Sequence, residues 1–302
     1  MPRNSYRTGS AFRAALEERL AQIARRESID LQRLRRQVAF DRLLARLTAV
    51  PGCPWVLKGG YAMELRYRKA RSTKDLDFTM RMPAADEAGM NSTWDSIQEA
   101  AAADLGDFFT FRIGKATIDV EGAPYGGGRY PVEAVFGGRA FARFHVDIGI
   151  GDLVLEPAET VQCRDWLHFA QIPPATVLMI SPEQQFAEKL HAYTFPRLKT
   201  PNSRVRDLVD MFLLVNSRSL LAERTKEAIQ STFARRRTHP VPPILQPPAK
   251  EWMRPFSTLA AECAIHAEVD EAFEIIEAYY RSLCKLGRLR ATPRKRSSNF
   301  FD

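Results

Sequence analysis

The chain has 302 residues, of which 45% are hydrophobic, so it can bury a sizeable core and should fold without disulfides. Its polar N-terminal segment and the lack of any apolar run of about 18 residues argue against a secretory signal and a membrane span, and we expect a cytoplasmic protein without a membrane partner. The formal net charge of +8, from 44 basic and 36 acidic residues, favours a polyanionic partner without requiring one.

The cysteines are far apart in the chain and form no C-x-x-C pair, so the sequence indicates neither a zinc ribbon nor a disulfide framework. We expect them to be small core residues in a reducing compartment. They are Cys53, Cys163, Cys263 and Cys284.

Basic residues gather in several short segments. They could be solvated helix faces followed by a disordered tail, or a surface that follows the backbone of a nucleic acid. The segments are Arg25–Arg26, Arg33–Arg36, Arg235–Arg237 and a tail that contains Lys285, Arg288, Arg290, Arg294, Lys295 and Arg296.

The N-terminal half mixes helical and strand patterns. Residues 12–49 carry apolar side chains at helical spacing, which predicts two or three helices that end before Pro51. The other elements predicted in this half are a strand at 55–57, a helix at 61–67, a strand at 75–80, a polar helix near 90–105, and β-rich stretches at 108–120 and 132–150 with glycine turns at 126–128 and 137–138.

From residue 181 the pattern becomes helical. Ser181-Pro182-Glu183 is typical of a helix start, with Ser181 as N-cap, and this helix should reach Tyr193. We expect the proline-rich segment 239–248 to be extended and exposed to solvent. The further helices predicted are 206–216, 222–235 and 270–286.

This order of elements predicts an α/β (α+β) fold, in which a mixed sheet flanked by helices is followed by a helical half. We expect two domains that meet near residue 175. The first, residues 1–175, includes the N-terminal helices, and the second, residues 176–302, ends in the basic tail.

Two acidic residues in one predicted strand give the strongest chemical signal. Alternate residues of a strand share a face, so Asp75 and Asp77 project together while Leu76 and Phe78 enter the core. Neighbouring carboxylates repel each other unless a cation bridges them, and Mg²⁺ prefers such oxygen ligands. Because acids at this spacing also occur by chance on polar strands, the pair needs support from its surroundings.

Two other segments support a phosphate and metal site. Gly59-Gly60 lies between a strand and a helix, where backbone N–H groups can receive a phosphate, and Lys58 adds positive charge. Asp147 stands in the otherwise apolar strand 144–149 and could complete a metal-binding triad with the acid pair. The alternative for Asp147 is a strand-end acid that caps a loop.

Five short motifs in this order resemble the AbiEii/AbiGii-type nucleotidyltransferase toxins, which include the MenT group and belong to the DNA polymerase β-like superfamily. Each motif is short, but the ordered set over residues 58–210 is specific. The motifs are Lys58-Gly59-Gly60, the run from Arg71 to Phe78, Asp147, the run from Glu188 to His191, and the run from Arg206 to Asp210.

The resemblance implies a nucleotidyltransferase fold in which the second domain completes the active-site cleft. Asp75, Asp77 and Asp147 would be catalytic and would hold Mg²⁺, with Mn²⁺ as the alternative. Lys189 would be catalytic and would grip the NTP, with Asp207 or Asp210 in a polar cluster beside it.

Nucleotide binding would also involve Lys58, Gly59, Gly60 and Thr73. The sequence departs from the wider superfamily at Gly60, where a serine is common, and Ser72 or Thr73 could supply a phosphate-binding hydroxyl in its place. The implied acceptor is the 3′ end of tRNA, and the implied partner is an AbiEi-like antitoxin.

Two alternatives stay open, namely nucleotidyl transfer to a protein or small molecule, and a catalytically silent module that binds RNA or a partner. Retention of the three acids and Lys189 argues against the silent module. Zinc binding is disfavoured because His145, His191 and His239 lack ligand partners at suitable spacing. Neither a G-x-S-x-G motif nor a cysteine motif supports nucleophilic catalysis.

Overall fold

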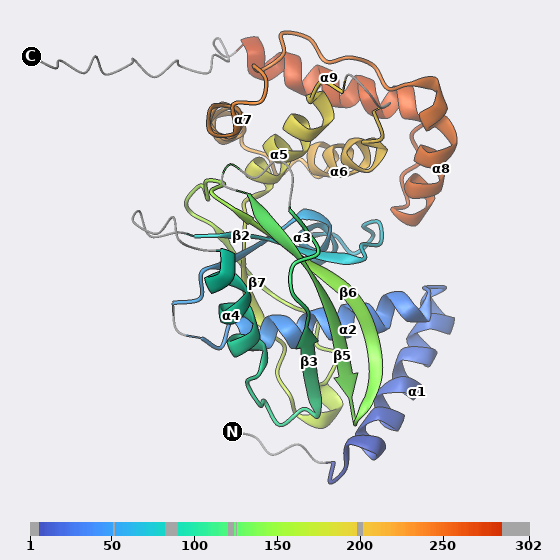
Figure 1. Cartoon of the computed structure of the whole chain (residues 1–302). Helices are drawn as coiled ribbons and strands as arrows, with labels where there is room; N and C mark the ends of the chain where they lie inside the picture. The colour runs from blue at the N-terminus through green and yellow to red at the C-terminus, as the bar shows by residue number, and fades with distance from the viewer. Residues whose placement is uncertain are drawn as a thin grey trace, which may run out of the picture. The chain divides into compact units, whose positions relative to one another are not determined.

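The computed structural model describes residues 6–50, 52–81, 90–119, 124, 126–197 and 202–285. It consists of two compact units, Met1–Ile180 and Ser181–Asp302 (Figure 1). The tail residues Arg288, Arg290, Arg294, Lys295 and Arg296 and the predicted element ends at Val120 and Leu286 lie outside the described residues.

Two helices open the first unit, as the sequence predicts. The hydroxyl of Thr8 accepts a hydrogen bond from the first turn of α1 (Gly9–Glu27), and left-handed Ser28 ends this helix. The Asp30 carboxylate caps α2 (Leu31–Leu47) in the same way. Two further helices of this unit are α3 (Gly59–Arg66) and α4 (Met90–Ala101), the second of which ends earlier than predicted.

The strands of the described residues form one mixed sheet in the order β3-β5-β6-β2-β1-β8-β7, with β4 paired to β5. The pair β2–β6 and the pair β1–β8 are parallel, while the other pairs are antiparallel. The strands are β1 (Trp55–Lys58), β2 (Asp75–Met80), β3 (Phe109–Ile113), β4 (Ile118–Asp119), β5 (Gly127–Phe136), β6 (Arg139–Ile150), β7 (Glu159–Gln162) and β8 (Thr176–Met179).

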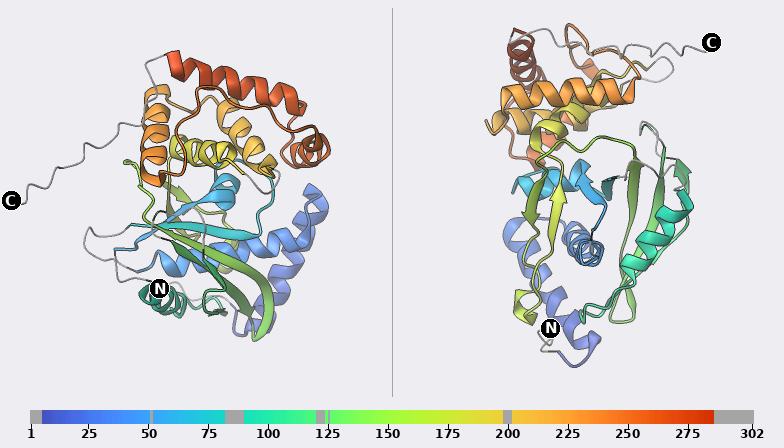
Figure 2. Two further views of the ribbon diagram at one scale, coloured as in Figure 1. Left: turned by 45° about the horizontal axis from the view of Figure 1, so that its top comes forward. Right: turned by 90° about the vertical axis from the view of Figure 1, so that its left-hand side faces the viewer.

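Helix α2 covers one face of this sheet. It contacts β6 and β8, and the right-hand view of Figure 2 shows it in blue between strands at the two ends of the sheet. Phe40 of α2 meets Phe144 of β6 edge-to-face, with ring centroids 4.8 Å apart. Leu76 and Val146, register partners on β2 and β6, are fully buried. Odd-numbered residues of these two strands therefore project from the opposite face.

One predicted turn and two elements differ from expectation. The turn at 137–138 is present between β5 and β6, but Gly127 and Gly128 belong to β5 and pair with β6. A Cβ on Gly127 would lie 2.1 Å from the carbonyl oxygen of Ile148, so this glycine serves close strand approach and not a turn. Strands β7 and β8 were not predicted.

The second unit is helical. Ser181 caps α5 (Pro182–Thr194) by accepting a hydrogen bond from the Gln184 N–H at 3.2 Å, which confirms the predicted helix start. The other predicted helices are present as α6 (Val205–Asn216), α7 (Ala222–Arg236) and α9 (Val269–Lys285), and α8 (Met253–Glu262) is additional.

The proline-rich segment 239–248 is free of helix and strand, but its predicted exposure is only partly correct. Leu245 is buried, and the carbonyl oxygens of Pro242 and Gln246 accept hydrogen bonds from Tyr280 and Tyr193. The segment is held by these contacts because each buried tyrosine hydroxyl needs a partner.

The predicted fold class, a mixed sheet flanked by helices and followed by a helical half, is confirmed. Among the described residues, no helix combines the length and apolarity that a bilayer crossing requires. All four cysteines are free thiols, and Cys163 and Cys263 are buried as predicted, whereas Cys53 and Cys284 are partly exposed.

Candidate active site

A row of four charged residues runs across the face of the sheet opposite α2. Lys58 of β1 is the register partner of Asp77, Asp77 is the partner of Asp147, and Asp147 is the partner of Arg129 on β5. Register partners on neighbouring strands project to the same face. The sheet therefore brings two predicted acids together between two cations.

Asp75 lies one step along the same face. It precedes Asp77 by two residues on β2, and its register partner on β6 is His145. Leu76 and Phe78 between and beyond the acids are buried, whereas both acids are partly exposed, as the alternation predicts. A rigid central strand thus presents two carboxylates to solvent.

The start of α3 lies against Asp77. Gly59 has φ +66°, and a Cβ there would lie only 2.0 Å from Oδ2 of Asp77, so only glycine leaves room for this carboxylate. The Gly60 N–H donates to the same oxygen at 3.4 Å. The glycine pair thus contacts an acid of the row, and it presents the positive end of a helix there.

Thr73 is placed beside this glycine pair. A Cβ on Gly60 would lie 2.7 Å from the Thr73 hydroxyl oxygen, and that hydroxyl donates to the carbonyl oxygen of Asp75 at 3.2 Å. The Thr73 N–H donates to buried Glu64 at 2.7 Å, and Arg33 donates to Glu64 at 2.9 Å. This network fixes the loop that leads into the acidic strand.

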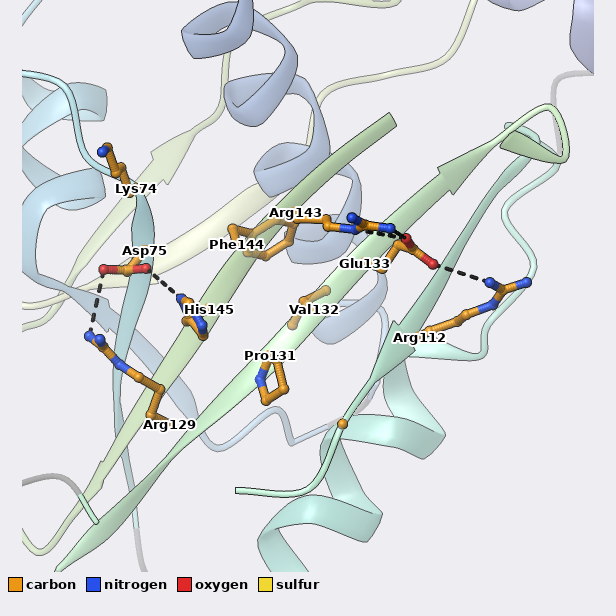
Figure 3. Close-up of a pocket in the computed structure, with 11 residues that line it drawn as sticks. Lys74, Asp75, Arg112, Arg129, Pro131, Val132, Glu133, Arg143, Phe144 and His145 are labelled. Atoms are coloured by element: carbon orange, nitrogen blue, oxygen red, sulfur yellow. Dashed lines mark hydrogen bonds and ion pairs between the residues drawn. The ribbon is translucent and has the colours of Figure 1, made fainter. Parts of the chain in front are cut away.

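Arg129, which the sequence interpretation missed, forms a two-pronged ion pair with Asp147. Its Nε donates to Oδ1 at 2.8 Å and its Nη2 to Oδ2 at 2.6 Å. Figure 3 shows the same guanidinium directed at Asp75, where Nη2 lies 3.6 Å from Oδ2. The hydrogen bond to Asp147, and then the charges of the three acids, raise the pKa of Arg129. It is therefore a permanent cation.

His145 and Asp152 are two further neighbours of the row. His145 Nδ1 lies 3.2 Å from Oδ1 of Asp75, and its side chain is 44% exposed. Lys58 forms an ion pair with Asp152 at 2.7 Å. The predicted phosphate-binding lysine thus already has an acid as partner.

An open cavity of about 710 Å³ adjoins Asp75 and continues over β5, β6 and β3 (Figure 3). Arg129 and His145 line it at the Asp75 end. At the other end, Arg112 and Arg143 both pair with Glu133, at 3.1 and 2.7 Å. Cationic side chains outnumber acids along this lining.

The acids of the row offer carboxylate oxygens, which are the ligands that a hard divalent cation prefers. Asp75 and Asp77 supply these oxygens from one rigid strand, and both acids are partly exposed. Within the described ranges, however, no group of three or more His, Cys, Asp or Glu side chains is arranged to hold a metal ion. The ion pair with Arg129 explains why an acid stands in this otherwise apolar strand, because both oxygens of Asp147 are bonded to that arginine.

The second unit holds the other predicted cluster. Lys189 on α5 lies 2.9 Å from Asp207 and 2.9 Å from Asp210, which are one turn apart on α6. Asp210 is fully buried and Lys189 is 13% exposed, so the lysine is not an ordinary surface side chain. Arg236 pairs with neighbouring Glu188 at 3.3 Å. The structure thus brings Lys189 and both candidate acids into contact.

A family model described as nucleotidyl transferase AbiEii toxin, type IV toxin–antitoxin system, matches residues 42–278, which is most of the chain. The chain belongs to the AbiEii family. Its motifs from Lys58 to Asp210 all lie inside the matched region. The AbiEii assignment makes the chain a nucleotidyltransferase toxin of a type IV toxin–antitoxin system, with an antitoxin as its partner, and confirms the resemblance on which the sequence interpretation relied.

One solved structure supports the fold. MenT4, a nucleotidyltransferase toxin from Mycobacterium tuberculosis H37Rv, is similar with a TM-score of 0.55 at 17% identity, over 88% of this chain and 98% of that chain. The crystal structure of JHP933 from Helicobacter pylori gives a TM-score of 0.47 at 15% identity, over 85% of this chain and 94% of that chain. A comparison with curated proteins gave no significant match.

Proposed function

We propose that this AbiEii protein transfers a nucleoside monophosphate from an NTP to an acceptor hydroxyl in a metal-dependent reaction, with the 3′ end of tRNA as the acceptor. The observation that carries the proposal is the pair Asp75 and Asp77 on one strand, next to the glycine start of α3 and to Asp147. Family membership supplies the reaction class.

In the proposed reaction, the acceptor oxygen attacks the α-phosphorus, a new P–O bond forms, and the bond to pyrophosphate breaks. Mg²⁺, or Mn²⁺ in its place, would stabilise the charge that develops on the phosphates. Asp75 and Asp77 would hold it together with Asp147, which would also align the attacking hydroxyl or take up its proton. Catalysis of this kind depends mainly on positioning and electrostatics.

Other residues would hold the nucleotide. The N–H groups at the start of α3 and the Thr73 hydroxyl would contact phosphate oxygens, because a helix start favours anions. Lys58 would leave its ion pair with Asp152 and pair with a phosphate group of the nucleotide instead. Lys189 would contribute a second positive charge to the triphosphate, while Asp207 and Asp210 orient its ammonium group.

The acceptor assignment rests on the family resemblance and on the basic side chains around the cavity. Arginine side chains contact phosphodiesters without regard to sequence, so binding of tRNA should weaken as salt is raised. In a cell, an altered tRNA 3′ end would block translation, and an AbiEi-like antitoxin would relieve the effect.

A labelling assay tests this proposal. Purified protein is incubated with total tRNA, Mg²⁺ and each α-³²P-labelled NTP in turn, and the products are separated on a denaturing gel. Label in the tRNA band that disappears with EDTA, with the Asp77→Ala variant and with periodate-oxidised tRNA supports the proposal.

Periodate destroys the terminal ribose diol, so it serves as a matched control for the acceptor hydroxyl. Label in protein or a small molecule but not in RNA would replace tRNA by another acceptor. Absence of label from every species would contradict nucleotidyl transfer itself.

A further inference from the structure

The Arg129 guanidinium lies at one end of the row, beside Asp147. It bonds both oxygens of Asp147 and approaches Asp75 to 3.6 Å. Asp77 lies on the same face, as the register partner of Asp147. One arginine therefore contacts two of the three carboxylates to which we assign metal binding.

The charges of the three acids explain why an arginine lies beside them. Three carboxylates on two adjacent strands repel one another, and an arginine among them offsets part of that repulsion. Lys58, the other cation of the row, is already paired with Asp152. Arg129 thus supplies positive charge next to both Asp147 and Asp75.

We propose that Arg129 is an internal counter-ion that a divalent metal ion displaces from Asp147, and that it thereby sets the metal affinity of the site. This inference rests on the proposed metal-dependent transfer. Each oxygen of Asp147 accepts one bond from Arg129, so the guanidinium lies on the side of Asp147 where an ion shared with Asp75 would bind, and an ion held by Asp75 and Asp77 would repel it. Arg129 is a positioning residue, because it acts through Asp147.

Arg129 has room to move. Its side chain is 35% exposed and lines the open cavity beside Asp75. The same cavity continues along β5 past Pro131, so the guanidinium can turn away from Asp147 into open space. The buried Arg46, by contrast, is 1% exposed and has no such path.

Direct Mn²⁺ binding tests the proposal without reference to activity. The electron paramagnetic resonance signal of free Mn²⁺ is titrated with the full-length protein, with Arg129→Gln and with Arg129→Lys. Removal of a unit charge next to the site should tighten Mn²⁺ binding by roughly tenfold in Arg129→Gln. Arg129→Lys, which keeps the charge but loses the two-pronged geometry, should fall between.

Arg143→Gln is the matched control. It removes the same charge from the same cavity, but Arg143 pairs with Glu133 and not with the row. Its Mn²⁺ affinity should stay within about twofold of the wild type, because exposed charges are strongly screened. Equal tightening in both variants would mean a general field effect and would overturn the proposal.

A double-mutant cycle tests the route through Asp147. In an Asp147→Asn background, Arg129→Gln should lose most of its effect on Mn²⁺ affinity, because the partner that it frees is absent. Melting curves should agree, with Mn²⁺ raising the melting temperature more in Arg129→Gln than in the wild type.

Unchanged or weaker Mn²⁺ binding in Arg129→Gln, while the wild type binds, would overturn this inference and leave the proposed function standing. A full Arg129→Gln effect in the Asp147→Asn background would overturn it as well. Failure of every variant to bind Mn²⁺ would overturn both this inference and the metal dependence of the transfer.

Discussion

Two clusters in the first unit combine arginine with aspartate, and they differ in balance and exposure. In the buried cluster, Asp107 receives hydrogen bonds from Arg42 at 2.7 Å and from Arg46 at 2.7 and 3.0 Å. Its side chain is fully buried, and neither arginine is more than 5% exposed. Burial by itself would raise the pKa of Asp107, but the hydrogen bonds and charges of the two arginines bring it below its ordinary value.

On the open face, acidic side chains of the row outnumber basic ones. Among the described residues of the row, the acids Asp75, Asp77 and Asp147 outnumber the cations Arg129 and Lys58. Asp75 and Arg129 are 30% and 35% exposed. The buried cluster is complete without a ligand, whereas the open one has negative charge that a cation can bind. Charge excess at an accessible position, and not the mere presence of ionic groups, is what makes the open cluster the candidate site.

The largest expected effect comes from the open cluster. Asp75→Ala or Asp77→Ala should abolish growth arrest on expression and lower transfer roughly a thousandfold or more, because a carboxylate that we propose as a metal ligand is lost. Circular dichroism should show an intact fold, since the removed charge repelled its neighbours. Survival of toxicity in either variant would remove the basis of the metal-transfer mechanism.

A substitution in the buried cluster should lower stability and not activity. Asp107→Asn leaves two buried guanidiniums without their carboxylate, and we expect a loss of about 3–5 kcal/mol in the free energy of unfolding. Transfer per folded molecule should be unchanged. Urea denaturation measures the first effect, and a loss below about 1 kcal/mol would show that water or another group compensates for the missing charge.

Asp41 extends the comparison to a buried acid whose nearest partners are neutral. It accepts hydrogen bonds from Tyr61 and from Trp166, the latter at 2.6 Å. Burial raises its pKa to about 7, although these hydrogen bonds lower it. The folded state thus keeps a proton that the unfolded chain releases near pH 4.

Stability should therefore fall as pH rises from about 4 to about 7 and should level off above that range. The contribution of Asp41 amounts to a few kcal/mol by linkage, and Asp41→Asn should remove it. Urea unfolding at a series of pH values measures this. A slope that is the same in Asp41→Asn and the wild type would assign the pH dependence to other groups.

The smallest effect belongs to an exposed ion pair. Arg143 and Glu133 are 79% and 22% exposed, and Arg143→Gln should change the free energy of unfolding by less than about 0.5 kcal/mol. Raising the salt concentration should reduce even this change. A larger loss in thermal or urea unfolding would show that Arg143 does more than balance Glu133.

The sequence predicts much of the acidic strand. Strict alternation defines β2 as Asp75–Met80, and the same alternation places Asp75 and Asp77 on the open face. Motif order indicates Lys189 and the two acids of α6, and these three do meet. Their role in catalysis stays a prediction.

Long-range pairing explains what the sequence does not reveal. Arg129 meets Asp147 only because a hairpin with a register shift between Ala134 and Val135 aligns β5 and β6, and no local pattern encodes that alignment. Only a correct prediction of the register of this hairpin would have identified Arg129 as the partner of Asp147. Strand β8 has only four residues and follows two prolines, so its periodicity is too short to detect.

Helix α8 was missed because Pro255 lies near its start and suggests a continued loop. In the first turn, however, backbone N–H groups lack partners within the helix, so proline is tolerated there. The Gly126–Gly128 run likewise suggests a turn, although close approach of β5 and β6 is what requires Gly127.

The most direct test of the central claim is transfer of label from an α-³²P NTP by the wild type and by Asp77→Asn, at matched protein concentration and with Mg²⁺ present. Asparagine keeps the shape of Asp77 but removes the charge that would hold the metal. We predict label in the 3′ end of tRNA with the wild type and none with Asp77→Asn. Equal labelling by the two proteins would contradict the assignment of the acidic row as the transfer site.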